Sequence, residues 1–187
     1  MNSRWMRFSG ISIMTKLSDY LYDLIQNSIE AKASQIELSL IHDGILRVTL
    51  KDNGVGMDSE TLMKVKTFRY SSRKTRTVGL GLSLIHDLTI QTNGYFEISS
   101  TLGVGTTLNL GFDHHHLDFP DMGDLALLVA DIYMHQGVQN FIFRYDNLVF
   151  NLETLGYTQT PKTFKQRNQL KQLIQDKLIE VANENTR

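Results

Sequence analysis

The chain has 187 residues, which is enough for one good hydrophobic core plus an extension. Its 19 basic and 20 acidic residues give a formal net charge of −1, so no overall field favours nucleic acid or another polyanionic partner. The absence of cysteine excludes disulfides, thiol catalysis and thiolate metal sites, and no stretch approaches the roughly 20 apolar residues of a membrane span. We therefore expect a cytoplasmic protein with no membrane partner.

Residues 1–15 are predicted to be a poorly ordered N-terminal lead, because they show neither clear periodicity nor a turn pattern. They contain no continuous apolar run of the kind that a secretion signal has. Met14 is an alternative start of the chain. We place no functional residue in this lead.

An amphipathic helix is predicted over residues 17–33, where apolar residues recur at helical spacing. At about 100° per residue, Asp23, Asn27 and Glu30 fall on one stripe away from the apolar face. A carboxylate and an amide therefore point the same way, which suits a polar ligand, although every surface helix has a polar side.

Two strands are predicted next, over residues 35–41 and 45–51, because apolar residues alternate on both sides of a hairpin turn. The second strand places Asp52 where the ladder ends, and a carboxylate there can accept a hydrogen bond from an exocyclic amine. Gly54 and Gly56 lack Cβ and so let a flat ring lie close to the main chain. The same residue types also make ordinary turns.

A locally basic segment runs from Met57 to Gly79 and includes Arg73 and Lys74. Its positive charge and donors suit a mobile lid over phosphates, although solvated loops are usually charged as well. The residues 79–82, Gly-Leu-Gly-Leu, then open a second amphipathic helix, and free N–H groups at such a helix start attract phosphate.

Two further strands, over residues 95–100 and 106–112, are predicted to complete the sheet. Thr106 is a secondary candidate for a hydroxyl near an adenine, although threonine is also a favoured strand residue. Three histidines follow at 114–116, and because adjacent side chains point in alternating directions, we favour a solvent-exposed connector over a zinc site.

Taken in chain order, these motifs resemble the ATP-binding boxes of the GHKL superfamily, which includes DNA gyrase, a heat-shock chaperone, histidine kinases and the mismatch-repair protein MutL. The resemblance covers residues 17–112. It implies an α+β fold of the Bergerat type, a two-layer α/β sandwich with helices on one face of a mainly antiparallel mixed sheet. It also implies ATP and Mg²⁺ as cofactors, with Asn27 as the magnesium ligand and Asp52 as the adenine acceptor.

The candidate nucleotide-binding residues come from these boxes and from the basic segment: Asn27, Asp52, Gly54, Gly56, Met57, Arg73, Lys74, Gly79, Leu80, Gly81, Leu82 and Thr106. One amide oxygen from Asn27, completed by waters and phosphate oxygens, is a reasonable shell for Mg²⁺. In the hydrolases of the superfamily, a glutamate four residues before this asparagine orients the attacking water. Here that position is Asp23, which is shorter by one methylene, so we expect slow turnover with Asp23 as the general base.

The sequence divides into the lead 1–15, an ATP-binding domain 16–113 and a C-terminal αββα extension 114–187. The extension is predicted from a helix over 121–135, strands over 140–145 and 148–152, and a last amphipathic helix from 161 onward.

The residues from Asn27 to Ala31 resemble the MutL branch, whereas the short lid and the residues 79–83, Gly-Leu-Gly-Leu-Ser, resemble histidine kinases. We therefore expect a bacterial-type, Mg-ATP-binding regulatory protein with slow ATP hydrolysis, coupled to lid closure and to a protein partner bound by the lid or the extension. The alternatives are a protein kinase acting in trans on a separate acceptor and a nucleotide-binding module without turnover.

Overall fold

A computed structural model describes residues 15–67, 80–157 and 162–184, and one six-stranded sheet runs through them in the order β3-β4-β2-β1-β5-β6. Neighbouring strands are antiparallel except β1 and β5, which are parallel, so the predicted mainly antiparallel mixed sheet is confirmed. The strands are β1 (Gln35–Asp43), β2 (Ile45–Asp52), β3 (Tyr95–Thr101), β4 (Gly105–Phe112), β5 (Asn140–Tyr145) and β6 (Leu148–Asn151).

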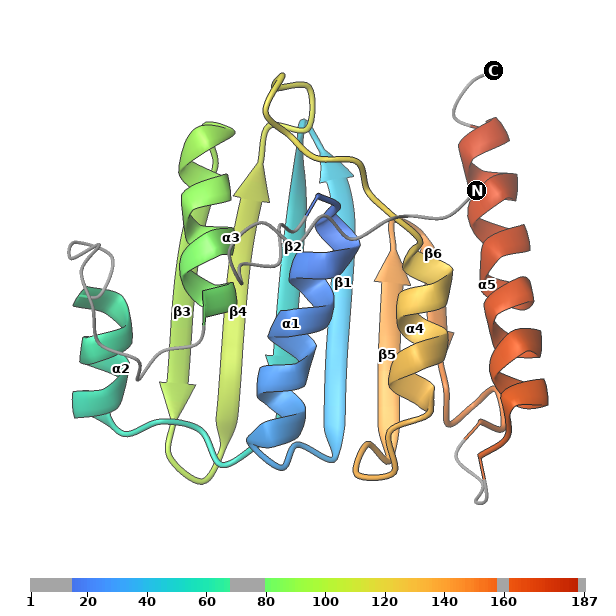
Figure 1. Cartoon of the computed structure of the whole chain (residues 1–187), viewed down its shortest axis with the longest axis horizontal. Coiled ribbons are helices and arrows are strands. Elements are labelled where there is room, and N and C mark those ends of the chain that lie inside the picture. Colours follow the sequence, from blue (N-terminus) through green and yellow to red (C-terminus); the bar gives the residue numbers. More distant parts are fainter. Residues whose placement is uncertain (1–14, 68–79, 158–161, 185–187) are drawn as a thin grey trace, which may run out of the picture.

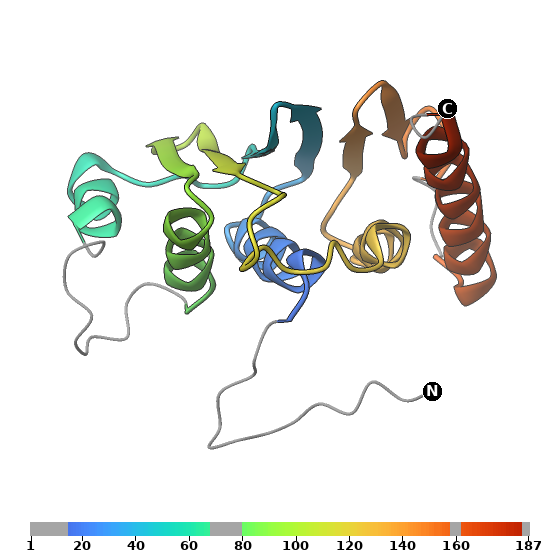
Figure 2. The same cartoon turned by 90° about the horizontal axis from the view of Figure 1, so that it is seen from above.

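Three helices cover one face of the sheet: α1 (Leu17–Glu30), α3 (Leu80–Gln91) and α4 (Leu125–Tyr133). Figures 1 and 2 show them side by side, with no described helix across the opposite face. α2 (Ser59–Thr67) lies at the β3 edge, and α5 (Phe164–Glu184) lies beyond β6 at the other edge. The predicted two-layer α/β sandwich is confirmed.

Alternation along the strands decides which face the helices cover. In β1, Ile36, Leu38 and Leu40 are buried, whereas the residues between them are partly or fully exposed. The register pairs Leu38 with Leu50 of β2, so the apolar side chains of both strands face the helix layer. The opposite face is polar, and Glu37 and Arg144 form an ion pair there at 2.6 Å, as expected for a sheet with one solvated side.

The C-terminal elements follow the predicted order α4, β5, β6, α5, but they do not form a separate layer. β5 pairs in parallel with β1 from Gln35 opposite Asn140 to Leu40 opposite Tyr145, so the sheet continues across residue 113. β4 and β5 follow each other among the strands and run in the same direction. A connection between strands that run in the same direction needs a long crossover, and α4 provides it on the helix-covered face (Figure 1). The boundary at 113 stays a prediction.

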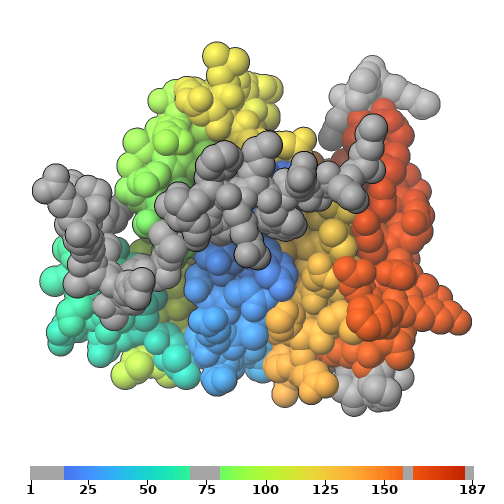
Figure 3. Space-filling view, viewed as in Figure 1, coloured from blue at the N-terminus to red at the C-terminus, as the bar shows by residue number. Residues whose placement is uncertain are grey.

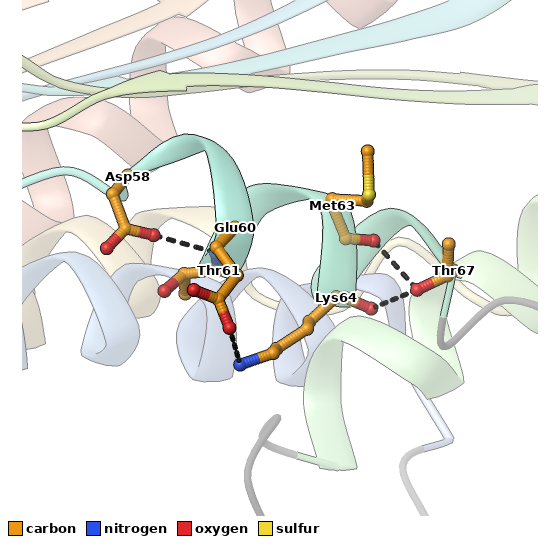
Figure 4. A network of polar contacts seen from close by, with 6 residues as sticks. All are labelled: Asp58, Glu60, Thr61, Met63, Lys64 and Thr67. Atoms are coloured by element: carbon orange, nitrogen blue, oxygen red, sulfur yellow. Dashed lines mark hydrogen bonds and ion pairs between the residues drawn. The ribbon is translucent and has the colours of Figure 1, made fainter.

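α2 is a helix that the sequence analysis did not predict, because its residues were assigned to a basic lid. Asp58 starts it, since its carboxylate accepts a hydrogen bond from the backbone N–H of Thr61 at 2.7 Å. Glu60 and Lys64 form an ion pair one turn apart along the outer side of the helix, and Thr67 bonds back to backbone carbonyls (Figure 4). The helix therefore has its own local stabilisation before residue 68.

Candidate functional site

A cavity of about 230 Å³ lies between the helix layer and the end of β2 where Asp52 stands. In the space-filling view, the surface of α1 is flanked by α4 on one side and by α2 and α3 on the other (Figure 3). Residues from six elements and from the connections after α1 and β2 line the cavity: Leu24, Asn27, Ser28, Ala31, Leu50, Asp52, Gly56, Met57, Thr61, Val65, Leu82, Ile98, Thr106 and Leu108. The volume is just below the range of about 300–1,000 Å³ that is usual for pockets that enclose a drug-sized ligand, so it suits part of a nucleotide.

Asp52 is held in this cavity by three hydrogen bonds. Its Oδ2 accepts from the hydroxyl of Ser28 at 2.8 Å, and its Oδ1 accepts from the backbone N–H of Gly54 at 2.9 Å and of Thr106 at 3.3 Å. One donor lies in α1, one in the loop that follows β2, and one in β4. Three separate segments therefore fix the carboxylate. A carboxylate has about four acceptor positions, which leaves room for a donor from a ligand.

Asn27 lines the same cavity, so the structure brings Asn27 and Asp52 together. The side-chain nitrogen of Asn27 is buried and has no hydrogen-bond partner in the described part of the chain. Buried polar atoms are nearly always paired, so this amide suits a site that a ligand completes. A half-turn of the amide presents its oxygen instead, which is the atom that Mg²⁺ prefers.

The described residues include no group of three or more His, Asp or Glu side chains that could hold a metal ion by themselves. A single amide oxygen fits an ion that is held mainly by phosphate and water, because Mg²⁺ usually keeps several waters. The donor set at Asn27 is therefore compatible with a magnesium ion that arrives with a nucleotide.

The glycines after β2 are required by the chain's own backbone. Gly56 has a positive φ of 64°, and a Cβ there would overlap the carbonyl oxygen of Thr101. A Cβ at Gly54 would lie 2.8 Å from the carbonyl oxygen of Ala31. Gly56 and Met57 line the cavity, whereas Gly54 lies buried beside Asp52 and does not.

On the sheet side, Thr106 lines the cavity, and its hydroxyl lies 2.9 Å from that of Ser100. Ser100 also accepts from the backbone N–H of Met57 at 2.8 Å and donates to the carbonyl of Gly105 at 2.9 Å. This serine therefore ties the loop after β2 to the β3–β4 hairpin. Leu82 lines the cavity from the first turn of α3.

Asp23 lies one helical turn before Asn27 but does not line the cavity. Its carboxylate lies against Gly81 in the first turn of α3. Burial raises the pKa of Asp23, and the negative charge of Glu30 raises it further. A raised pKa is the direction that a carboxylate needs to act as a base nearer neutral pH.

Three of the predicted ligand residues, Arg73, Lys74 and Gly79, lie outside the described residues, and Leu80 is the first residue of α3. Conversely, Ser28, Thr61 and Val65 line the cavity without having been predicted. Ser28 follows Asn27 by one position and so falls off the polar stripe. The two residues of α2 were missed because that helix was missed.

The histidines after β4 lie at the other end of the sheet, where the rings of His114 and His115 are 4.1 Å apart, but they belong to no group in the described residues that could hold a metal ion. His114 is half-buried against His42, with ring centroids 5.4 Å apart, whereas His115 is exposed. Desolvation lowers the pKa of His114. The expectation of exposure is thus right for His115 and wrong for His114 and His116, which are half-buried. His114 is covered by His42 of β1, which Asp146 in the β5–β6 turn holds in place.

The fold and the cavity define a class of protein, an α/β sandwich with a cavity between its helices and the end of a central strand. The profile of the "Histidine kinase-, DNA gyrase B-, and HSP90-like ATPase" family matches residues 14–116, more than half of the chain. The chain therefore belongs to this family of ATPases.

A putative sensor protein of Shewanella frigidimarina is 34% identical over 102 residues, which cover 52% of this chain and 16% of that protein. A probable C4-dicarboxylate sensor kinase of Halalkalibacterium halodurans is 30% identical over 95 residues, which cover 47% of this chain and 18% of that protein. The chain thus spans less than a fifth of either relative.

Among solved structures, the MutL ATPase domain of Aquifex aeolicus complexed with ADP has a TM-score of 0.53 and 16% identity, covering 85% of this chain and 69% of that one. The 85% of this chain that is covered exceeds the part matched by the family profile, residues 14–116. The similarity of fold therefore continues into the C-terminal elements. In the described ranges, no helix combines the length and apolarity that crossing a membrane requires.

Proposed function

We propose that this chain is a cytoplasmic, bacterial-type regulatory protein that binds Mg-ATP and hydrolyses it slowly. The observation that carries the proposal is the shared cavity of Asp52, fixed by three donors, and Asn27, whose buried amide nitrogen has no partner in the described chain. Membership of the ATPase family and the similarity to an ADP-bound MutL domain support the same ligand.

Base selection follows from the donors around Asp52. Its oxygens act only as acceptors, so the remaining acceptor position in the cavity selects an N–H donor such as the 6-amino group of adenine. Thr106 adds a hydroxyl beside it, and Leu50, Ile98 and Leu108 supply apolar walls for a flat ring. We therefore propose that the 230 Å³ cavity takes the adenine and that the phosphates extend toward Asn27 and the first turn of α3.

Asn27 would hold Mg²⁺ through its amide oxygen, and the bound ion would neutralise charge on the phosphates. Asp23 stands on the same stripe of α1 and would take the proton of the attacking water. Its carboxylate is shorter than that of a glutamate, so the proton transfer is less well placed and turnover is slow. We further propose that residues 57–79, which include α2, close over the phosphates and signal the bound state to a protein partner.

Two other functions stay in competition. The similarity to two bacterial sensor proteins favours a protein kinase that acts in trans on a separate acceptor. A module that binds nucleotide without turnover needs only the cavity. Both alternatives predict the same binding site and differ in what happens to the γ-phosphate.

Calorimetric titration with ATP, ADP and GTP, with and without Mg²⁺, tests the ligand. We expect saturable ATP binding that Mg²⁺ strengthens, weaker GTP binding, and loss of ATP binding in Asp52→Ala. The matched control is Asp43→Ala, which removes a carboxylate whose side chain is 70% exposed at the opposite end of the sheet. Unchanged ATP affinity in Asp52→Ala would remove the basis of the adenine assignment.

Labelled γ-phosphate separates the three reactions. Phosphate released to solvent indicates a hydrolase, label transferred to an added protein indicates a kinase, and binding with neither indicates a module. We expect release, and we expect Asp23→Ala to bind ATP while losing that release.

A further inference from the structure

The contact between α1 and α3 has an unusual composition, a carboxylate against a glycine. A Cβ built on Gly81 would overlap Asp23 Oδ2, would lie 2.7 Å from Asp23 Cγ and would lie 3.4 Å from Asp23 Cβ. These three atoms of one side chain are the nearest neighbours of that position. The carboxylate of Asp23 therefore fills the volume that any side chain at residue 81 needs.

No backbone requirement explains the glycine. Gly81 is a helical residue of α3 and is absent from the glycines with positive φ, so an L-residue can adopt its conformation. Glycine in a helix is less stable than alanine because it loses more conformational freedom on folding. What Gly81 provides is space for Asp23.

That space also matters for Asp23, because little else fixes its carboxylate. Within the described ranges it makes no hydrogen bond or ion pair, and its charged neighbour Glu30 repels it. Figure 1 shows α1 and α3 adjacent on the helix-covered face, so the first turn of α3 forms the wall against which Asp23 rests. The wall is one helical turn from Asn27, on the same stripe of α1.

We propose that Gly81 is a positioning residue, whose missing side chain lets the Asp23 carboxylate lie at the phosphate end of the site. The inference rests on the proposed function, in which Asp23 is the base. In that reaction a water oxygen bonds to the γ-phosphorus, its proton passes to Asp23, and the bond between the γ-phosphorus and the bridging oxygen breaks to leave ADP and phosphate. A side chain at 81 turns Asp23 away from this water and leaves the nucleotide contacts of Asp52 and Asn27 in place.

The test is a double-mutant cycle of Gly81→Ala and Asp23→Ala. We expect Gly81→Ala to lower the rate of ATP hydrolysis at saturating ATP by at least about tenfold, which is part of the roughly 100-fold or more that a general base contributes. In the Asp23→Ala background, only the Cβ of residue 23 remains, and it would lie 3.4 Å from a Cβ at residue 81. Gly81→Ala should therefore cause no further loss of ATP hydrolysis in that background. Gly137→Ala is the matched control, because a Cβ there meets nothing within 4 Å and its φ is not positive.

Two measurements on the nucleotide-free protein decide the inference without any turnover. Carbon-13 NMR titration should show the Asp23 carboxyl pKa moving toward its ordinary value in Gly81→Ala, because the carboxyl turns out toward water. Thermal unfolding should show that Gly81→Ala raises Tm in the Asp23→Ala background, since alanine is more stable than glycine in a helix. With Asp23 present, the overlap of the new Cβ with its carboxylate should make the increase smaller or turn it into a decrease.

An unchanged Asp23 titration, or an equal effect of Gly81→Ala on Tm in both backgrounds, would overturn the positioning role. A wild-type protein that binds ATP without hydrolysing it would instead defeat the turnover part of the proposed function. The two failures are therefore distinguishable.

Discussion

Ser28 of α1 contacts Asp52 of β2 in the cavity through its hydroxyl. Its side chain is buried at 4% exposure and donates to Oδ2 of Asp52 at 2.8 Å. Because the other carboxylate oxygen is held by the backbone of Gly54 and Thr106, Ser28 is the only side-chain donor that the described structure gives Asp52. Its removal should loosen the carboxylate without removing it.

We expect Ser28→Ala to weaken ATP binding by about tenfold or more, since a hydrogen bond to a charged group contributes about 1.5–3 kcal/mol. Calorimetric titration measures the change. Ser99→Ala, which removes an exposed hydroxyl from β3, is the matched control. Equal affinities of Ser28→Ala and wild type would show that the backbone donors alone hold Asp52.

Asp23 sets a pH dependence of stability. Burial, with the charge of Glu30, raises its pKa in the folded state above the ordinary value of 3.8, so folding favours the neutral acid. Its stabilising contribution is complete below pH 3.8 and is lost as the pH rises through the folded-state pKa. We expect Asp23→Asn to have a higher Tm than wild type at about pH 7, with the difference gone near about pH 3. Equal Tm values at both pH values would contradict the desolvation of Asp23.

At the scale of the elements, α5 packs against α4 through a few apolar residues on one side of the helix. Leu170 and Ile174 are fully buried against α4, while Leu173 between them is 40% exposed. Arg167 pairs with Asp131 and Lys171 pairs with Asp124 along the same contact. The helix is therefore joined to α4 by a narrow apolar stripe with charged pairs beside it.

We expect Ile174→Ala to lower the free energy of unfolding by about 2–5 kcal/mol, the usual cost of a large apolar side chain removed from a core. Leu173→Ala, on the exposed side of the same turn, should cost less than about 1 kcal/mol. Urea unfolding measures both. Similar small effects would show that α5 contributes little to the stability of this chain.

At the level of the whole molecule, the sheet joins the N-terminal and C-terminal halves. β5 covers the edge of β1 along six paired residues, and Phe141 and Phe143 of β5 are fully buried in the common core. An uncovered β1 would leave an edge strand with unpaired backbone groups and exposed apolar residues. The two halves should therefore unfold together.

We expect the full chain to show one cooperative unfolding transition, and a chain truncated to residues 16–113 to aggregate or to unfold without a sharp transition. Calorimetry on both chains makes the comparison. A sharp, reversible transition in the truncated chain would instead support the predicted domain boundary after residue 113.

The sequence by itself determined the elements whose signals are local. Alternating apolar residues predicted β1 to β4, helical spacing predicted α1 and α3, and the strand end at Asp52 marked one wall of the cavity, because each pattern is complete within a few residues. It missed α2, since the charges of that segment suggested a lid and outweighed the cap at Asp58.

Only the tertiary structure decided what depends on residues that are far apart in the chain. The pairing of β5 with β1, the hydroxyl of Ser28 on Asp52 and the contact of Asp23 with Gly81 join positions separated by many residues. Such contacts arise from the packing of whole elements, and no local periodicity encodes which elements will meet.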